Sequence, residues 1–439
     1  MGSAPWRTGP QRVWKFTMTA SAKATAPSPH PGMGFPQFVV LMAALMALSA
    51  MGIDAMLPAL PQIARGFHVA QANQQQLVVT VFLLSFGMAQ LFFGPLVDRY
   101  GRKPILLWGL GFYGLFSLAA ALAPTFEWLL IARALQGVAI STTRVAPISI
   151  IRDCYSGRRM AQVMSLAFLV FMAVPIMAPA LGQAVILVAS WRWIFGAFAI
   201  VTAMVAIWVL IKLPETLRPE DVRPINLFEI VDAFRITLRS RLGMGYSLAQ
   251  TVLFGGLFGF INSAPQVFED ALGAADKFTM GFAIVAAFIA CASLVNARLV
   301  NRLGMRVMSH TALMIFIVTS GVHATIAVTG HESLVSFLIL QSITMFCFGL
   351  MSGNFGAMAM EPLGHVAGAA ASVQGFVSMV GGSIIGFAIG QSFNGTLVPI
   401  TLGYLTCGFI ALGIVLWAEK GRLFAAHAHP AGEAPPAMH

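Results

Sequence analysis

The chain has 439 residues, of which 58% are hydrophobic and only 10% are charged. Soluble domains carry about 25% charged residues, so this composition excludes an ordinary soluble protein. Repeated apolar runs of about 20 residues predict membrane-spanning α-helices, whereas a β-barrel would show short alternating segments.

Twelve apolar runs divide the sequence six and six, which predicts an all-α membrane protein with two six-helix halves around a central cavity. The predicted domains are a disordered tail (1–35), a first half (36–213), a linker (214–241), a second half (242–419) and a second tail (420–439). The predicted spans lie near 36–61, 73–97, 103–124, 126–151, 160–188, 191–213, 242–268, 277–300, 305–329, 331–359, 366–391 and 394–419. Within the linker, Asn226–Arg239 is amphipathic enough to lie along the membrane surface.

The net charge of +10 predicts orientation rather than a nucleic-acid partner. Of the 26 Lys and Arg residues, only Arg65, Arg192 and Lys277 fall in predicted outer loops, and Arg133 and Arg144 fall inside spans. The other 21 lie on the side of the two tails. The positive-inside rule therefore predicts that both termini are cytoplasmic.

The sequence predicts neither a cofactor nor a metal site. The four cysteines have no paired spacing, and the histidines of the tail His427–His439 are expected to be solvated. The apolar runs predict membrane lipid as a partner, and the protein is expected to be a monomer.

In the first span, Asp54 is the only charged residue of Phe38–Leu60. A carboxylate at membrane depth costs at least about 2.5 kcal/mol on insertion scales, so it is usually retained for proton exchange, ion coupling or substrate contact. The alternative is a structural carboxylate that fixes helix packing.

The turn after the second span reads GPLVDRYGRKPIL, Gly94–Leu106. Gly94 and Gly101 permit unusual backbone angles and close approach. Asp98 is suited to bind a helix N-terminus or an arginine, and Arg99, Arg102 and Lys103 anchor the inner face. The alternative for this segment is a generic basic turn. A similar segment, Ala297–Arg306, follows the eighth span, which suggests two related halves, with chance matching as the alternative.

In the fourth span, Arg133 lies seven residues from the outer end, and Asp54 lies seven residues from the outer end of the first. Both are therefore about 10 Å deep, and we expect them to pair. Arg144 follows Arg133 by eleven residues, about three turns, so an Arg133–Gln136–Arg144 stripe is expected to line a cavity. Alternatively, Arg144 snorkels inward or caps a neighbouring helix.

The fifth span contains Pro175, Pro179 and Gly182, which predict a kinked helix that seals the halves; ordinary tolerance of proline in membrane helices is the alternative. Gln76, Asn262 and Asn354 are predicted to line the cavity, or else to bond helices together.

The segment Gly94–Leu106 resembles the signature loop of the major facilitator superfamily. That resemblance implies a cytoplasmic latch in which Asp98 pairs with Arg152. Gly52–Pro61, Ala132–Gly137 and Ala173–Gly182 resemble the "D-x-x-x-P", "R-x-x-Q-G" and span-5 motifs of twelve-span drug:proton antiporters. Asn354–Ala369 is similar to the Bcr/CflA branch, and the whole resemblance covers about 36–419.

The resemblance implies a proton-coupled exporter of small, largely apolar compounds in a bacterial inner membrane. Its expected partners are therefore protons and a small-molecule substrate. Because Met46 stands where some relatives carry a second carboxylate, one proton per cycle is expected and export of dicationic drugs is in doubt. A metabolite exporter (sugar, amino acid derivative or siderophore) and a non-transporting sensor stay open. We expect no enzyme, since neither a catalytic constellation nor an ATP-binding loop is readable.

Overall fold

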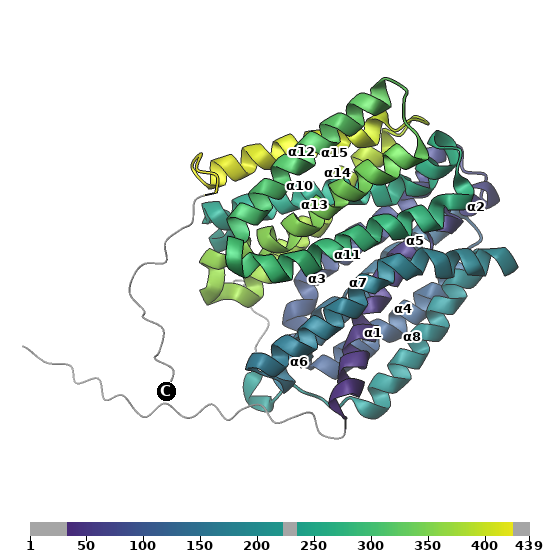
Figure 1. Cartoon of the computed structure of the whole chain (residues 1–439). Coiled ribbons are helices and arrows are strands. Elements are labelled where there is room, and N and C mark those ends of the chain that lie inside the picture. The colour runs from purple at the N-terminus through teal and green to yellow at the C-terminus, as the bar shows by residue number, and fades with distance from the viewer. Residues whose placement is uncertain (1–32, 223–234, 425–439) are drawn as a thin grey trace, which may run out of the picture.

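The computed structural model describes residues 33–222 and 235–424, and their helices lie in two groups (Figure 1). The first group consists of α1 (Phe35–Asp54), α2 (Leu60–Gly66), α3 (Leu77–Tyr100), α4 (Arg102–Ala121), α5 (Phe126–Ile140), α6 (Thr142–Cys154), α7 (Gly157–Val188) and α8 (Arg192–Lys212). The second consists of α10 (Arg241–Gln266), α11 (Phe278–Leu303), α12 (Met305–Val328), α13 (Leu334–Met360), α14 (Ala367–Gln391) and α15 (Val398–Ala418).

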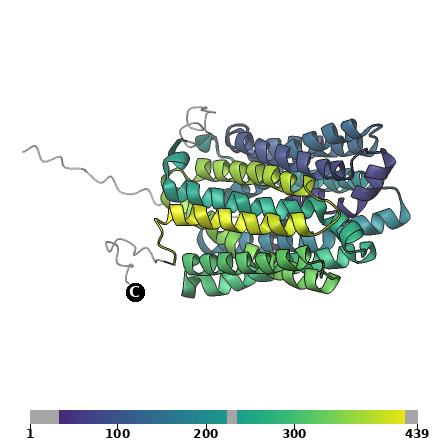
Figure 2. The same ribbon diagram turned by 90° about the horizontal axis from the view of Figure 1, so that it is seen from above.

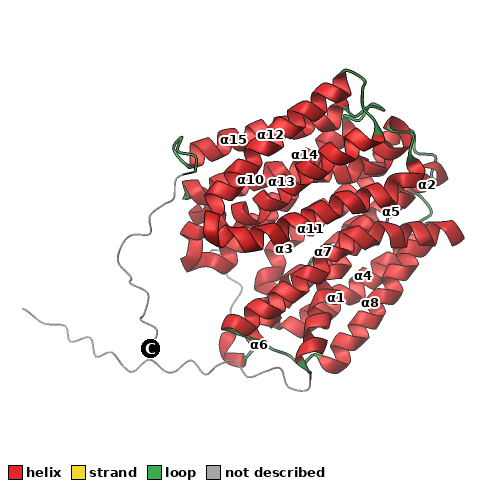
Figure 3. Cartoon of the chain, in the orientation of Figure 1, coloured by secondary structure: helices red, strands yellow, loops and turns green. Residues whose placement is uncertain are grey.

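Twelve helical segments of the described residues are long and apolar enough to cross a membrane, which confirms the predicted number of spans. Two of them are interrupted: the first is α1, a short turn and α2, and the fourth is α5 followed by α6. Short loops connect the helices (Figure 3). Most of the two predicted tails, with the histidines of His427–His439, and most of Asn226–Arg239 lie outside the described residues.

Helix α4 illustrates why the outer surface is apolar. Trp108, Phe112, Leu115, Leu118 and Leu122 are exposed and recur every three or four residues, so they form one face of the helix. In water this face would be unfavourable, but lipid solvates it. The opposite face packs on α5 and α8.

The two groups meet mainly where α3 packs on α14 and α7 packs on α11 (Figure 2). The α3–α14 approach is close because a Cβ at Gly87 would lie 2.7 Å from the Cβ of Met379. Both ends of the described chain lie on one side of the helices, here called the termini side (Figure 1). The loops Phe67–Gln71 and Ser392–Leu397 lie on the opposite, far side.

Candidate functional site: polar groups within and between the helix groups

Asp54 lies at a break in the first span. Helix α1 ends at Asp54 because Pro58, four residues later, has no N–H to continue the ladder to the Asp54 carbonyl. The chain then forms a tight turn over Leu57–Ala59. The Asp54 residue is buried, with 5% of its surface exposed.

Gly182 of α7 allows close packing beside this break. A Cβ at Gly182 would overlap the backbone carbonyl of Ala55 and would lie 3.2 Å from Pro58. Helix α7 itself runs through Pro175 and Pro179 without interruption, so Phe171 and Pro175 each lose a backbone partner inside it. Pro175, Pro179 and Gly182 therefore lie in one continuous helix. Its Gly182 contacts the chain just after Asp54.

The predicted Asp54–Arg133 ion pair is wrong for this structure. Among the described residues, none forms an ion pair with Asp54. Arg133 contacts α1 close to the predicted depth, but its guanidinium donates to the backbone carbonyl of Gly52, at 2.9 Å, and not to Asp54. At about 100° per residue, Asp54 points some 200° away from Gly52, to the other side of α1.

Arg133 instead joins four helices of the first group. Its guanidinium donates to the Val78 carbonyl at 3.0 Å and to Gln136 Oε1 at 3.0 Å, besides the bond to Gly52. Gln136 in turn donates to Ser117 Oγ at 2.7 Å. These bonds connect α5 to α1, α3 and α4.

Neither Arg133 nor Gln136 lines a cavity, because both are 0% exposed. The guanidinium also lies 4.1 Å from the centroid of the Phe82 ring, which adds a cation–π contact. The predicted polar stripe of the fourth span is therefore wrong at these two positions.

Arg144 is separated from Arg133 by a break in the fourth span. The hydroxyls of Ser141, Thr142 and Thr143 each donate to the carbonyl three residues earlier, at 2.7, 2.9 and 2.8 Å. Such bonds compete with the helical ladder and bend helices. Arg144 is half-buried, and its guanidinium lies 5.9 Å from the centroid of Phe171 on α7.

The turn between α3 and α4 is organised by Glu215, which the sequence reasoning missed. Its carboxylate accepts the backbone N–H groups of Arg102 at 3.0 Å and Lys103 at 3.1 Å, and so caps the N-terminus of α4. Gly101 permits this cap because its φ is 99° and because a Cβ would lie 2.5 Å from the carboxylate. Lys103 also donates to the Leu210 carbonyl on α8 at 2.9 Å.

Asp98 pairs with Arg102 at 3.0 Å, so the predicted Asp98–Arg152 pair is wrong in this conformation. Arg102 also bonds Asp153 of α6 at 2.9 Å, while Arg152 is exposed. The arginine that holds the turn is therefore the buried Arg102, and the α6 partner is the residue after Arg152.

We expect Asp98→Asn and Arg102→Gln to slow vesicle transport several-fold while leaving ligand affinity unchanged, because the turn sets conformational populations rather than the binding site. Flux in vesicles and ligand titration in detergent separate the two effects. Exposed Arg158 of α7 offers the matched control, Arg158→Gln. Normal flux in a well-folded Asp98→Asn protein would contradict the latch, and an equal loss in Arg152→Gln would show that another conformation pairs it with Asp98.

The second group has its own charge cluster at the corresponding place. Arg306 bonds Glu419 at 2.8 Å and Glu361 at 3.2 Å, and the Tyr246 hydroxyl donates to Glu419 at 2.6 Å. Arg306 belongs to the repeated segment recognised in the sequence, but its two acidic partners come from distant helices. Four helix ends, those of α10, α12, α13 and α15, are joined here.

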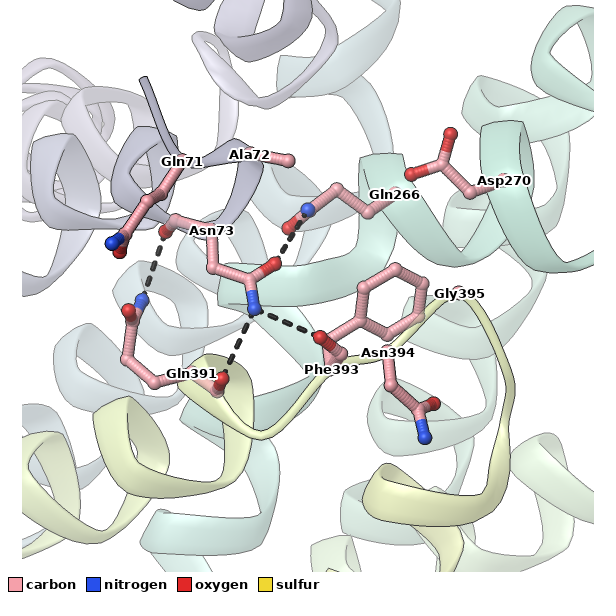
Figure 4. Close-up of a pocket in the computed structure, with 9 residues that line it drawn as sticks. All are labelled: Gln71, Ala72, Asn73, Gln266, Asp270, Gln391, Phe393, Asn394 and Gly395. Carbon is pink, nitrogen blue, oxygen red and sulfur yellow. Dashed lines mark hydrogen bonds between the residues drawn. The ribbon is translucent and has the colours of Figure 1, made fainter. Parts of the chain in front are cut away.

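On the far side, four amide side chains connect the two groups, and we call Asn73, Gln76, Gln266 and Gln391 the amide seal. Figure 4 shows Asn73, Gln266 and Gln391. Asn73 donates to the Gln391 and Phe393 carbonyls at 3.0 and 2.8 Å and accepts from Gln266 at 2.9 Å. Gln391 donates back to the Asn73 carbonyl at 2.8 Å. A pocket of about 400 Å³ opens beside the seal and is lined by Gln71, Asp270 and Asn394 among others.

Gln76 belongs to this seal, so its predicted place in an open cavity is wrong for this conformation. It donates to Gln266 Oε1 at 2.7 Å and to the Gly390 carbonyl at 3.0 Å. Gly390 leaves room for this arrangement, because a Cβ there would overlap the Gln76 amide and displace it. The sequence shows each of these amide residues separately. It does not show which of them form hydrogen bonds between helices of opposite groups.

Asn262 and Asn354 differ in whether their side-chain amides have hydrogen-bond partners. Asn262 lies one turn before Gln266 on α10, is 1% exposed, and both its amide atoms are unpartnered among the described residues. Asn354 donates to Asn296 Oδ1 at 2.8 Å and to the Leu350 carbonyl at 2.9 Å. Asn354 thus bonds helices α13 and α11 rather than lining a cavity. Asn262 is also enclosed in this conformation, but its unpartnered amide distinguishes it, and its place in a cavity stays a prediction for the opened far side.

We expect Gln76→Ala to open the far side more often, because it removes bonds that exist only when the groups are closed. A loss of about 1–2 kcal/mol corresponds to a roughly 5- to 30-fold population shift. The measurement is the labelling rate of Asn262→Cys by an impermeant maleimide from the far side, in a background without native cysteines. Gln71→Ala, an exposed amide outside the seal, is the control; unchanged labelling in Gln76→Ala would refute the gating role.

Comparison with known proteins agrees with this architecture. Residues 42–386 match the model of the Major Facilitator Superfamily. An uncharacterised transporter of this type from Bacillus subtilis, YdgK, is 30% identical over 82% of this chain and 90% of its own length. A bicyclomycin resistance protein homolog from Haemophilus influenzae is 28% identical over 85% and 94%, and the multidrug resistance protein MdtL of Klebsiella pneumoniae is 27% identical over 88% and 97%.

The family match covers most of the chain, and the relatives align over nearly their full lengths. Together with twelve spans in two groups, they identify the chain as a member of the major facilitator superfamily that resembles its drug-efflux transporters.

Proposed function

We propose that the protein is a proton-coupled antiporter that exports small, largely apolar drugs or toxic compounds across the bacterial inner membrane by alternating access. The observation that carries the proposal is Asp54, a buried carboxyl group inside a span without an ion pair to any described residue. A carboxyl group so placed is costly to keep charged, and taking up a proton relieves that cost.

The termini side would be the cytoplasmic side, as the Lys and Arg distribution predicts. In that orientation the amide seal closes the outer side, and the turn held by Arg102 lies inside. The conformation described here would then be the one that receives substrate from the cytoplasm. Opening the seal and closing the inner side would complete the cycle, in a protein that works as a monomer.

Transport measured in proteoliposomes tests the proposal. An imposed pH gradient, acidic on the side of the amide seal, is expected to drive substrate uphill toward that side. Dissipating the gradient with a protonophore should stop accumulation. Uphill transport that does not depend on the proton gradient would refute proton coupling.

Two alternatives share the same fold. The relatives named for bicyclomycin and multidrug resistance favour foreign compounds over a cell metabolite such as a sugar, amino acid derivative or siderophore. A non-transporting sensor would bind ligand in detergent and give no flux in proteoliposomes.

A further inference from the structure

Arg144 lies at membrane mid-depth on α6, the half of the fourth span that runs to the termini side. It precedes the end of α6 at Cys154 by ten residues, about 15 Å along the helix, which is half of a hydrocarbon core. Thr142 faces α4, because a Cβ at Gly109 would overlap its hydroxyl. Arg144 is about 200° further around and therefore points away from α4, toward Phe171 of α7.

Helix α7 is, with α3, one of the two helices that make most of the contacts of the first group with the second. Phe171 packs against Ala43 and Met46 of α1, so a side chain of α6 that points to Phe171 faces neighbouring helices of the first group. Lipid is a costly surrounding for an arginine at this depth. Arg144 is only half-buried, whereas Arg133 on the same span is fully enclosed by its bonds. Its charge is available to a molecule that enters between the groups.

No carboxylate of the described residues forms an ion pair with Arg144. Apart from Asp54, every acidic residue of the described spans lies within two residues of a span end. Asp54 lies at the other end of α1, nineteen residues from its start at Phe35, and so about 28 Å from the termini side. Arg144 is a cation at mid-depth without a protein counter-charge, which is costly unless a bound molecule supplies one.

The surface beside Arg144 is apolar. Phe168 and Phe171 of α7 are partly exposed, and they pack over the buried Ala43, Met46 and Ala167. One cation next to an aromatic and aliphatic surface is suited to an amphiphile with a single anionic group.

We propose that Arg144 determines specificity by binding the anionic group of an amphiphilic organic monoanion whose apolar body rests on Phe171. The inference rests on the proposed export function and names its substrate class. It also has an energetic consequence. One proton entering and one anion leaving move two charges in the same direction, so the membrane potential drives export, whereas exchange of one proton for a monovalent cation is electroneutral.

The test uses three matched fluorescent probes with the full chain in detergent: 1-pyrenebutyrate, its methyl ester and a pyrenebutyl-trimethylammonium cation. We expect the carboxylate to bind roughly 10- to 100-fold more tightly than the ester, as a charge-assisted bond implies. Arg144→Gln should remove this preference while leaving ester affinity unchanged, and Arg144→Lys should retain part of it. The exposed Arg158→Gln of α7 is the matched control and should behave as wild type.

Equal binding of carboxylate and ester by the wild type would overturn the inference, and so would tighter binding of the cation. An equal loss of both probes in Arg144→Gln would also overturn it, since this is what a purely structural arginine predicts. Export of neutral compounds driven by protons, without a carboxylate preference, would leave the proposed function standing and refute only this inference. A carboxylate preference without proton-driven flux would uphold the site and refute the function.

Discussion

Asp54→Asn will abolish export driven by a pH gradient, reducing it to the level of empty vesicles. Asparagine has nearly the shape of the neutral carboxyl group, so the break before Pro58 and the contact with Gly182 are preserved. An amide cannot take up and release a proton at neutral pH, however, and the cycle loses its coupled ion. Exchange of labelled substrate across vesicles without a gradient should persist, because the remaining groups are unchanged.

Substrate-induced proton release from detergent-solubilised protein measures the same step directly. The variant should release no protons, while Asp276→Asn, an exposed carboxylate on the far side, should release as many as wild type. If Asp54→Asn matches wild type in proton release, another group carries the coupling. If it loses exchange as well as driven export while its thermal stability is unchanged, Asp54 binds substrate rather than protons alone.

Arg133→Ala will destabilise the first helix group rather than alter proton affinity alone. The substitution leaves the Gly52 and Val78 carbonyls and the Gln136 amide without their shared donor in a region that excludes water. Each buried acceptor that loses its donor typically costs about 1–3 kcal/mol. We expect the unfolding midpoint in detergent to fall by roughly 5–10 °C.

Arg133→Lys should recover only part of the loss, because an ammonium group does not reproduce the planar fork that reaches three acceptors. Arg158→Ala, at an exposed arginine of α7, should change the midpoint little. An Arg133→Ala protein with normal stability and selective loss of pH-driven export would contradict the anchoring role. That outcome would restore a direct part for Arg133 in coupling.

The number of spans could be predicted from sequence because it depends on apolar length, which hydropathy measures directly. The unusual backbone conformation at Gly101 could also be predicted. A short basic loop that is bounded by glycines and lies between two apolar runs can adopt few backbone conformations. The depth of Arg133 on α1 was predicted correctly to within two residues, because depth follows from 1.5 Å per residue.

The direction in which a side chain points around its helix axis could not be predicted in the same way. Arg133 reaches Gly52 rather than Asp54 because the side of α1 that meets α5 is decided by packing with Tyr113 and Phe82, which approach Gly52 within 2.8 and 3.1 Å of a Cβ position. The eleven-residue spacing to Arg144 likewise assumed one straight helix, and the bonds of Ser141–Thr143 interrupt it.

By itself, the sequence determined the membrane fold, the placement of a lone carboxyl group in the first span and the loop that marks the superfamily. Only the tertiary structure decided which groups are partners: Arg102 with Asp98 and Asp153, Glu215 on the start of α4, and amides of opposite helix groups in one seal. The physical reason is that hydropathy and helix rise are summed along the chain. Partner choice instead depends on rotation and contact between helices far apart in sequence.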